Sequence, residues 1–354
     1  MIGIISSEFG EGSGAEVVLE HLLRGWSQSA LPIILLTPPQ SRIGRVAAEL
    51  SLPVVPLLTK RDAFRHNFLA ARRSVKDLTD CRVIHAWHSR GFELAWWLGH
   101  RLGAPYSGTV HDHPAITAHS WRRRQLMRFA ANRMKGLVCV SEATRDAWNT
   151  TGCRAPMVVI RNGLRDRPAR RRAGKTIRVG FLGMYSSWKG FGSVERWIKQ
   201  TRDEDVVWHL YGDIAPCWES RAKLVAESHP GSVLLRGKQP PDQIYSEIDI
   251  LVHASTEFDP LPTVLIEAAR AGIPSVASNL GGAPEIMVHG KTGFHFDPAQ
   301  PQVGLDFLTT LIQQTRLRED FGRAARLHFE QHFPLDRMVG EYLKFWTRVA
   351  GLAD

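Results

Sequence analysis

The sequence of 354 residues has few cysteines and no long apolar run. Its four cysteines, Cys81, Cys139, Cys153 and Cys217, are widely spaced, which disfavours both a disulfide framework and a zinc site. No apolar run approaches the roughly twenty residues of a transmembrane helix. The opening residues, MIGIISSEFG, lack the basic region and cleavage site of a signal peptide and are interpreted as a buried strand. We therefore expect a cytoplasmic protein.

Acidic residues are fewer than basic ones, with 35 Asp and Glu against 45 Lys and Arg, a formal net charge of +10. A basic surface favours anionic partners, which include nucleotide phosphates, acidic lipid headgroups and nucleic acid. The sequence has no helix-turn-helix, RNA-binding or zinc-finger pattern, so we do not expect nucleic acid as the partner. Charge alone leaves the nucleotide and the membrane surface open.

Short apolar segments alternate with helical patterns along the chain, which is typical of parallel sheets with crossover helices. We predict an α/β protein with two doubly wound, Rossmann-like domains at residues 1–165 and 176–334. The arginine-rich residues 166–175 are interpreted as the linker, and residues 335–354 as a C-terminal helix.

Eleven strands are predicted from apolar runs. They cover residues 2–5, 32–36, 82–86, 106–110, 136–140 and 157–160 of the first domain, and 177–182, 206–211, 232–236, 249–253 and 274–277 of the second. Ligands of such sheets bind beyond the carboxyl ends of the strands, so the loops that follow the strands are the candidate sites.

A glycine-rich turn, GEGSG at residues 10–14, follows the first strand and opens a helix. Backbone N–H groups and the helix N-terminus favour a phosphate there. The same turn is also explained by helix capping, because Ser13 and Glu16 have the spacing of a capping box. Taken alone, the turn is a weak signal.

Two further loops carry single polar residues. His111 follows a predicted strand, where it either bonds a sugar hydroxyl or satisfies loop carbonyls, and His85 and His88 present the same alternatives. Lys189 lies in a glycine-flanked loop at a helix start, where an ammonium neutralises a leaving diphosphate. A solvated lysine is the simpler interpretation of that residue.

The most specific segment is DPLPTVLIEA at residues 259–268. The loop carboxylate of Asp259 is followed eight positions later by Glu267, within a helix whose start is marked by Pro262. Carboxylates accept hydrogen bonds from sugar hydroxyls, while the backbone N–H groups at the helix N-terminus suit a diphosphate. An acidic residue near a helix start is also favoured by the helix dipole alone. The glycine-rich SNLGGAPE at residues 278–285 favours the functional interpretation.

The chain resembles the retaining glycosyltransferases of family 4, which have the GT-B fold. The likeness is carried by DPLPTVLIEAARAGIPSVASNLGGAPEIMVHGKTGFHFDP at residues 259–298, and earlier by VSEATRD, VIRNG, FLG, KG and YGD in the family's order. The resemblance implies two Rossmann-like domains facing across a cleft, with the last helix crossing back to the first domain. It also implies a metal-independent hexosyltransferase with a UDP- or GDP-sugar donor, no cofactor, and a saccharide or lipid-linked acceptor.

The resemblance also assigns residues to parts of the donor. Glu267 would bind the ribose hydroxyls, and Asp259 and His111 the donor sugar. The base would be held by Gly237 and Lys238. The diphosphate would be held by a larger set, namely Gly12, Ser13, Gly14, Lys189 and the amides near Leu261, Pro262 and Thr263.

Three positions depart from the family pattern. Asp259 stands in place of glutamate, with Glu257 as a rival for its role. Met184 stands where many members have an arginine that pairs with the diphosphate, and Arg165 replaces a frequent aspartate. The alternatives are an inverting GT-B transferase, a nucleotide-sugar epimerase, or a basic protein that binds membrane or nucleic acid.

A basic stretch at residues 120–135, SWRRRQLMRFAANRMK, permits contact with a membrane. On a helical wheel one broad apolar face is formed by Leu126, Met127, Phe129, Ala130 and Met134. A core-packed helix with a solvated basic face is the slightly favoured interpretation. The alternative is a peripheral contact with anionic headgroups at the inner membrane face, as suits a lipid-linked acceptor in bacterial polysaccharide or glycolipid assembly.

Overall fold

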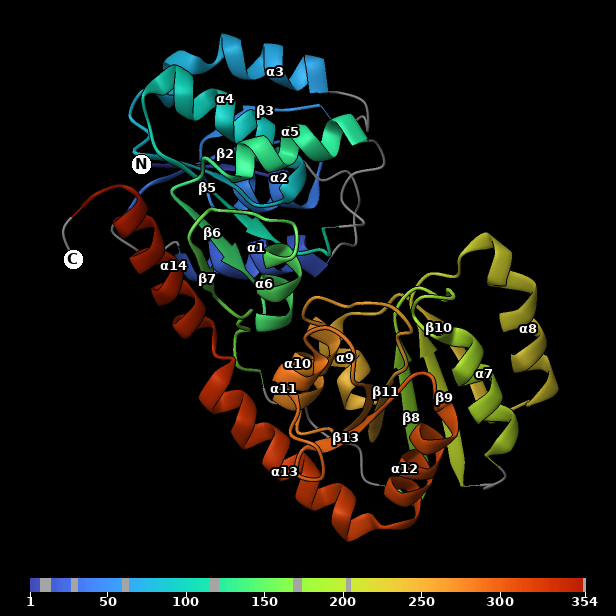
Figure 1. Cartoon of the computed structure of the whole chain (residues 1–354). Coiled ribbons are helices and arrows are strands. Elements are labelled where there is room, and N and C mark those ends of the chain that lie inside the picture. Colours follow the sequence, from blue (N-terminus) through green and yellow to red (C-terminus); the bar gives the residue numbers. More distant parts are fainter. Residues whose placement is uncertain are drawn as a thin grey trace. The chain divides into compact units, whose positions relative to one another are not determined.

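A computed structural model describes residues 1–6, 14–26, 31–58, 64–114, 121–167, 174–201 and 205–352. The chain divides into two compact units (Figure 1). The first comprises Met1–Arg165 together with Leu335–Asp354, and the second comprises Asp166–Pro334. Gly12 and Ser13 of the glycine-rich turn, and residues 168–173 of the predicted linker, lie outside the described residues.

The first unit is built on a seven-stranded parallel sheet with the order β3-β2-β1-β4-β5-β6-β7. The order reverses between β1 and β4, and the loops after these two strands therefore begin at the switch point where doubly wound sheets bind ligands. The strands are β1 (Ile2–Ile5), β2 (Ile33–Thr37), β3 (Val54–Pro56), β4 (Val83–Ala86), β5 (Tyr106–Val110), β6 (Gly136–Cys139) and β7 (Met157–Val159).

Helices cover both faces of the first sheet. One apolar core includes Leu22, Ile4 and Trp346, and the other includes Phe92 and Met134. The helices are α1 (Gly14–Trp26), α2 (Arg42–Glu49), α3 (Phe64–Arg73), α4 (Phe92–Leu102), α5 (Trp121–Ala131), α6 (Glu142–Asn149) and α14 (Leu335–Val349), with short 3-10 turns at Val75–Leu78 and Ser89–Gly91.

The C-terminal helix α14 belongs to the first unit although it follows the second in sequence. The Leu335 backbone N–H donates to the Leu164 carbonyl, which ties the start of α14 to the end of the first segment. Trp346 then packs edge-on against Trp26 of α1, with 5.1 Å between ring centroids. Burial of these large aromatic rings holds α14 on the sheet.

The second unit has a six-stranded parallel sheet with the order β10-β9-β8-β11-β12-β13. Its strands are β8 (Ile177–Leu182), β9 (Val206–Tyr211), β10 (Val233–Gly237), β11 (Ile250–His253), β12 (Ser275–Ser278) and β13 (Gly293–Phe296). Its helices are α7 (Phe191–Gln200), α8 (Glu219–Ser228), α9 (Pro241–Ser246), α10 (Thr263–Arg270), α11 (Ala283–Ile286), α12 (Pro301–Gln313) and α13 (Thr315–His332), with a 3-10 turn at Pro216–Trp218.

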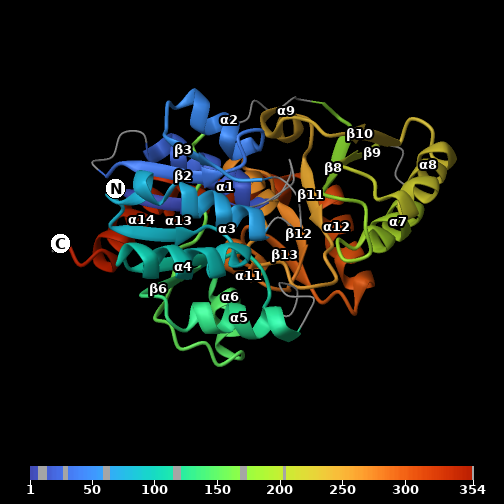
Figure 2. The same cartoon turned by 90° about the horizontal axis from the view of Figure 1, so that it is seen from above.

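The two faces of the second sheet differ in chemistry. In Figure 1, α7 and α8 lie on one side of the sheet and α9 and α10 on the other, and Figure 2 shows α7 and α8 together again. The α7 side buries an apolar core that includes Trp208 and Leu210 of β9. Because successive strand residues point to opposite faces, His209 and Tyr211 face α9 instead. The prediction of an α/β protein with two Rossmann-like domains is confirmed.

Candidate active site

His111 lies at the carboxyl end of β5, beside residues that follow β4. Its ring centroid is 5.1 Å from that of Trp87 and 5.5 Å from that of His88. Trp87 is fully buried, and its indole N–H donates to the Ala15 carbonyl at 2.8 Å. This bond fixes the start of α1, which begins at Gly14, next to the same strand ends. The described start of α1, at Gly14, therefore lies beside the residues around His111.

The His111 ring is neutral. Burial, together with the nearby His88 and His85 rings, holds the pKa of His111 well below its usual range. Its Nε2 is buried and has no hydrogen-bond partner within the described part of the chain. A buried polar atom without a partner is uncommon, and a ligand group that reached this nitrogen would complete its bonding. A neutral imidazole suits a hydroxyl at that position.

His85 has a structural role instead. Its Nδ1 lies 2.8 Å from the Ser107 hydroxyl and its Nε2 lies 2.9 Å from the Thr109 hydroxyl. Burial lowers its pKa to about 3, so the ring is uncharged at neutral pH. Both ring nitrogens are occupied, and His85 is therefore unavailable to a ligand.

In the second unit, Lys189 and Asp259 form a nearly buried ion pair. The Lys189 Nζ donates to the Asp259 Oδ2 at 2.6 Å, with the two side chains only 18% and 10% exposed. The His253 Nε2 lies 3.2 Å from the same oxygen. Burial would raise the pKa of Asp259, but the Lys189 ammonium and the His253 ring outweigh it and hold that pKa well below its usual range. Asp259 is thus an anion whose charge is matched by Lys189.

Glycines allow the loops that carry this pair to approach each other. Gly190 has a φ of +72°, and a Cβ there would collide with the Ala254 carbonyl. The Thr256 N–H donates to the Trp188 carbonyl at 2.8 Å, which joins the loops after β8 and β11. Gly281, with a φ of +58°, packs in the same way on the Asp259 carbonyl. The KG and GG motifs therefore bring together backbone segments that hold the ion pair.

Glu267 lies in the second turn of α10, and its side chain is buried. Its Oε2 accepts a hydrogen bond of 2.8 Å from the Tyr245 hydroxyl. The helix begins at Thr263, with Leu261 and Pro262 immediately before it. Because the first N–H groups of a helix have no partner within the helix, the start of α10 offers donors to an anion.

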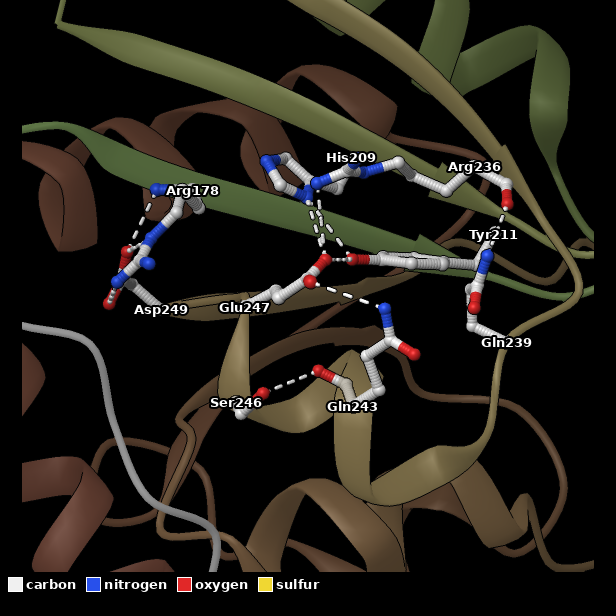
Figure 3. A network of polar contacts seen from close by, with 9 residues as sticks. All are labelled: Arg178, His209, Tyr211, Arg236, Gln239, Gln243, Ser246, Glu247 and Asp249. Carbon is white, nitrogen blue, oxygen red and sulfur yellow. Dashed lines mark hydrogen bonds and ion pairs between the residues drawn. The ribbon is translucent and has the colours of Figure 1, made fainter.

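A polar network lies at the end of β10 (Figure 3). Glu247 Oε2 accepts from the Tyr211 hydroxyl at 3.0 Å and from the Arg236 guanidinium at 3.2 Å. Gly237, with a φ of +62°, follows directly, and Lys238 pairs with Asp213 at 2.7 Å on an exposed surface. The network anchors the end of β10 next to the two residues predicted to line a base pocket.

Comparisons with known proteins identify the two domains. A family model described as "Glycosyltransferase Family 4" matches residues 12–167, and one described as "Glycosyl transferases group 1" matches residues 164–328. The chain has the two domains of a GT-B glycosyltransferase. Anabaena HepE, solved with UDP and with UDP-glucose, shares the GT-B fold at 19% identity with a TM-score of 0.85, over 98% of this chain and 99% of that one.

Two curated relatives match shorter stretches. The spore coat protein SA of Bacillus subtilis (strain 168) is 30% identical over 107 residues, which are 30% of this chain and 28% of that protein. The Vi polysaccharide biosynthesis protein VipC/TviE of Salmonella typhi is 31% identical over 93 residues, which are 25% of this chain and 16% of that protein. The chain thus spans less than a third of each of these two relatives.

Within the GT-B second domain, the structure separates the two rival acids. Asp259 is buried beside Lys189, whereas Glu257 is exposed. Met184 is exposed as well, so the position where the family resemblance implies an arginine presents an uncharged side chain. Among the described residues, no cluster of three or more His, Cys, Asp and Glu side chains is placed to hold a metal ion.

Two contact residues were missed at the level of sequence. His253 ends a predicted strand, so the rule that selected His111 would also have selected it. Tyr245 gave no signal, because its relation to Glu267 depends on how α9 packs against α10.

Proposed function

We propose that the protein is a retaining glycosyltransferase that moves a hexose from a UDP-sugar to a hydroxyl group of its acceptor. The observation that carries the proposal is the set of Lys189, Asp259 and Glu267, all buried or nearly so around the carboxyl ends of β8 and β11. Ligands of doubly wound sheets bind beyond such strand ends. The HepE structures, solved with UDP and UDP-glucose, support this choice of donor.

We assign the diphosphate to Lys189 and to the N-terminus of α10. The ammonium and the free N–H groups stabilise the negative charge that grows on the leaving diphosphate, and no metal ion is needed for that task. Asp259 keeps the ammonium oriented through its 2.6 Å bond, and its Oδ1 is left for a sugar hydroxyl. Glu267 accepts a hydrogen bond from the ribose, as carboxylates commonly do from hydroxyls.

We assign the acceptor to the first domain, where the neutral His111 offers a hydrogen bond to a hydroxyl group. The leaving diphosphate takes the proton of the acceptor hydroxyl on the face it departs from, which preserves the anomeric configuration. Because the pKa of His111 is held well below its usual range, its neutral ring is a poor base, and it orients the sugar without taking that proton.

A donor-hydrolysis screen over UDP- and GDP-sugars tests the proposal. We expect at least one UDP-sugar to release UDP, and Lys189→Ala to lower turnover by at least about a hundredfold, the scale of losing one transition-state stabiliser. Lys199→Ala is the matched control, because the exposed Lys199 pairs with Glu195 within α7, away from Asp259, and its loss should leave turnover unchanged. Failure of every nucleotide-sugar to bind would contradict the proposal.

We further propose that α5 contacts an anionic membrane that presents a lipid-linked acceptor. Three apolar side chains of this helix are exposed: Trp121 by 68%, Leu126 by 41% and Phe129 by 39%. Neighbouring arginines such as Arg124 and Arg128 are exposed too, and the mixture of aromatic and cationic side chains is typical of interfacial helices. Of the apolar face predicted for this stretch, Met127, Ala130 and Met134 are buried, whereas Leu126 and Phe129 are exposed.

The membrane proposal concerns a surface contact and a role in glycolipid or polysaccharide assembly. In the described part of the chain, no helix combines the length and the apolar composition needed to cross a bilayer. The match to a polysaccharide biosynthesis protein of Salmonella typhi supports the assembly role.

A further inference from the structure

A cavity of about 360 Å³ lies within the first unit, between α5 and residues 148–153. Its volume falls in the range of small-molecule sites, roughly 300–1,000 Å³. Met127, Ala131 and Trp148 line it, and all three side chains are buried. None of the lining residues is among those assigned to the nucleotide-sugar donor. The cavity is therefore a second candidate site, with an apolar inner wall.

The polar groups of this wall are already bonded within the protein. The Thr150 hydroxyl donates to the Ala147 carbonyl at 2.7 Å, and the Thr151 hydroxyl donates to the Trp148 carbonyl at the same distance. The Trp148 indole N–H donates to the Asp112 carbonyl at 3.1 Å. Because these donors are used, the wall offers mainly carbon atoms to a ligand. Such a surface favours a hydrocarbon chain, which gains by leaving water.

The exposed part of the lining carries positive charge. Arg124 and Arg128 line the cavity and are exposed, and neither has an ion-pair partner among the described residues. The Arg128 guanidinium reaches the turn after α6, since a Cβ added at Gly152 would lie 3.0 Å from one of its nitrogens. Guanidinium groups bind phosphate oxygens well. A phosphate monoester carries about 1.5 to 2 negative charges at neutral pH, which two arginines match.

We propose that this cavity binds the hydrocarbon chain of a lipid phosphate, with the phosphate group held by Arg124 and Arg128. The inference deepens the proposed contact of α5 with a lipid-linked acceptor and rests on that proposal for the identity of the lipid. Asp112, whose carbonyl accepts the Trp148 N–H, directly follows His111 in sequence. A lipid held here is therefore anchored next to the first-domain loop that we assign to the acceptor.

Calorimetry with soluble probes, below the concentrations at which they form micelles, tests the chain and the charge separately. In the unmodified protein, affinity should rise about fourfold for each methylene added from butyl phosphate to octyl phosphate, the effect of burying one methylene. Octanol has the chain without the charge and should bind at least about tenfold more weakly than octyl phosphate. Inorganic phosphate should bind more weakly than butyl phosphate, which distinguishes a lipid from free phosphate as the ligand.

Two variants test the location of the site. Cys153 lines the cavity and is partly buried, so the ring of Cys153→Phe should occupy the space of the chain and weaken octyl phosphate binding at least about tenfold. Cys217→Phe, at an exposed position of the second unit, is the matched control and should bind normally. Arg128→Gln should weaken octyl phosphate binding about tenfold and leave octanol binding unchanged. Arg122→Gln, at an exposed position of the same helix outside the lining, should change neither.

Equal affinities of the unmodified protein for butyl and octyl phosphate, or for octanol and octyl phosphate, would overturn the inference, and these measurements need no variant to fold. Undiminished octyl phosphate binding by Cys153→Phe would overturn it as well. Nucleotide-sugar turnover is measured independently. A protein that binds the probes as predicted but releases UDP from no UDP-sugar would overturn the proposed function and leave the lipid site supported.

Discussion

Lys189→Met, made alone and together with Asp259→Asn, tests whether the ion pair is both a structural and a catalytic element. With side chains 18% and 10% exposed, the two charges lie mostly out of water at a separation of 2.6 Å. Removing one partner of a buried pair costs about 3–5 kcal/mol, because the remaining charge is left unpaired. Because some exposure remains here, we expect Lys189→Met to lower the free energy of unfolding by about 3 kcal/mol. Asp259 would then keep only its contact to His253.

The double variant leaves no unpaired charge. Replacing both members of a buried pair often changes stability little. The free energy of unfolding of the double variant should therefore lie within about 1 kcal/mol of that of the unmodified protein. Urea unfolding of the unmodified protein, Lys189→Met, Asp259→Asn and the double variant gives the four free energies of unfolding. Turnover should be at least about a hundredfold lower than in the unmodified protein both in Lys189→Met and in the double variant, because both lack the ammonium. Strictly additive losses of stability would refute the pairing, and near-normal turnover in the double variant would refute the catalytic role.

Three further predictions concern the nucleotide site, acid stability and the membrane. Glu267→Gln should weaken UDP binding by about 1.5–3 kcal/mol in calorimetry, since it removes a charge-assisted bond, and an unchanged affinity would exclude Glu267 from the site. The pKa of His85 falls from the ordinary 6.5 to about 3 in the folded state, so its contribution to stability is present above pH 6.5 and is lost as pH falls below that value. Between pH 7.5 and 5, His85→Asn should therefore lose about 2 kcal/mol less of its unfolding free energy than the unmodified protein, and equal losses would contradict this. The protein should co-sediment with anionic liposomes but not with neutral ones, and high salt should weaken this binding. The double variant Trp121→Ala, Phe129→Ala should bind anionic liposomes less, whereas Leu224→Ala, at an exposed position of α8, should bind them as the unmodified protein does. Equal binding to both kinds of vesicle, or to neither, would remove the membrane from the account.

Much of the fold was predictable because parallel strands buried on both faces give short apolar runs. The strands at Val54–Pro56 and Gly293–Phe296 were missed. The first is a three-residue edge strand that ends in proline, and Pro53 precedes it. The second, GFHF, contains glycine and histidine, and its assignment depends on pairing with β12. Neither segment has a local pattern that separates it from a loop.

The broad apolar face predicted on α5 shows a limit of the helical wheel. The wheel groups every apolar side chain of one arc, but the helix meets the core along a narrower stripe. Buried positions recur at the spacing of that stripe, namely Met127, Ala130, Ala131 and, just past the helix, Met134. Leu126 and Phe129 lie at its margins and are exposed.

In the candidate site, motifs identified the residues but not their mutual contacts. Lys189 and Asp259 were selected separately, and their bond joins positions 70 residues apart. Such a contact follows from strand order, which the sequence pattern does not specify. The same holds for Tyr245, whose bond to Glu267 arises from packing between two helices.

The anomeric configuration of the first product tests the central claim most directly. An active UDP-α-hexose donor would be incubated with the protein, and ¹H NMR would record the anomeric proton of the product before mutarotation. The account predicts an α-configured product, formed together with UDP and lost when Lys189 is replaced by alanine. A β-configured product, or the absence of sugar transfer from every nucleotide-sugar donor, would contradict it.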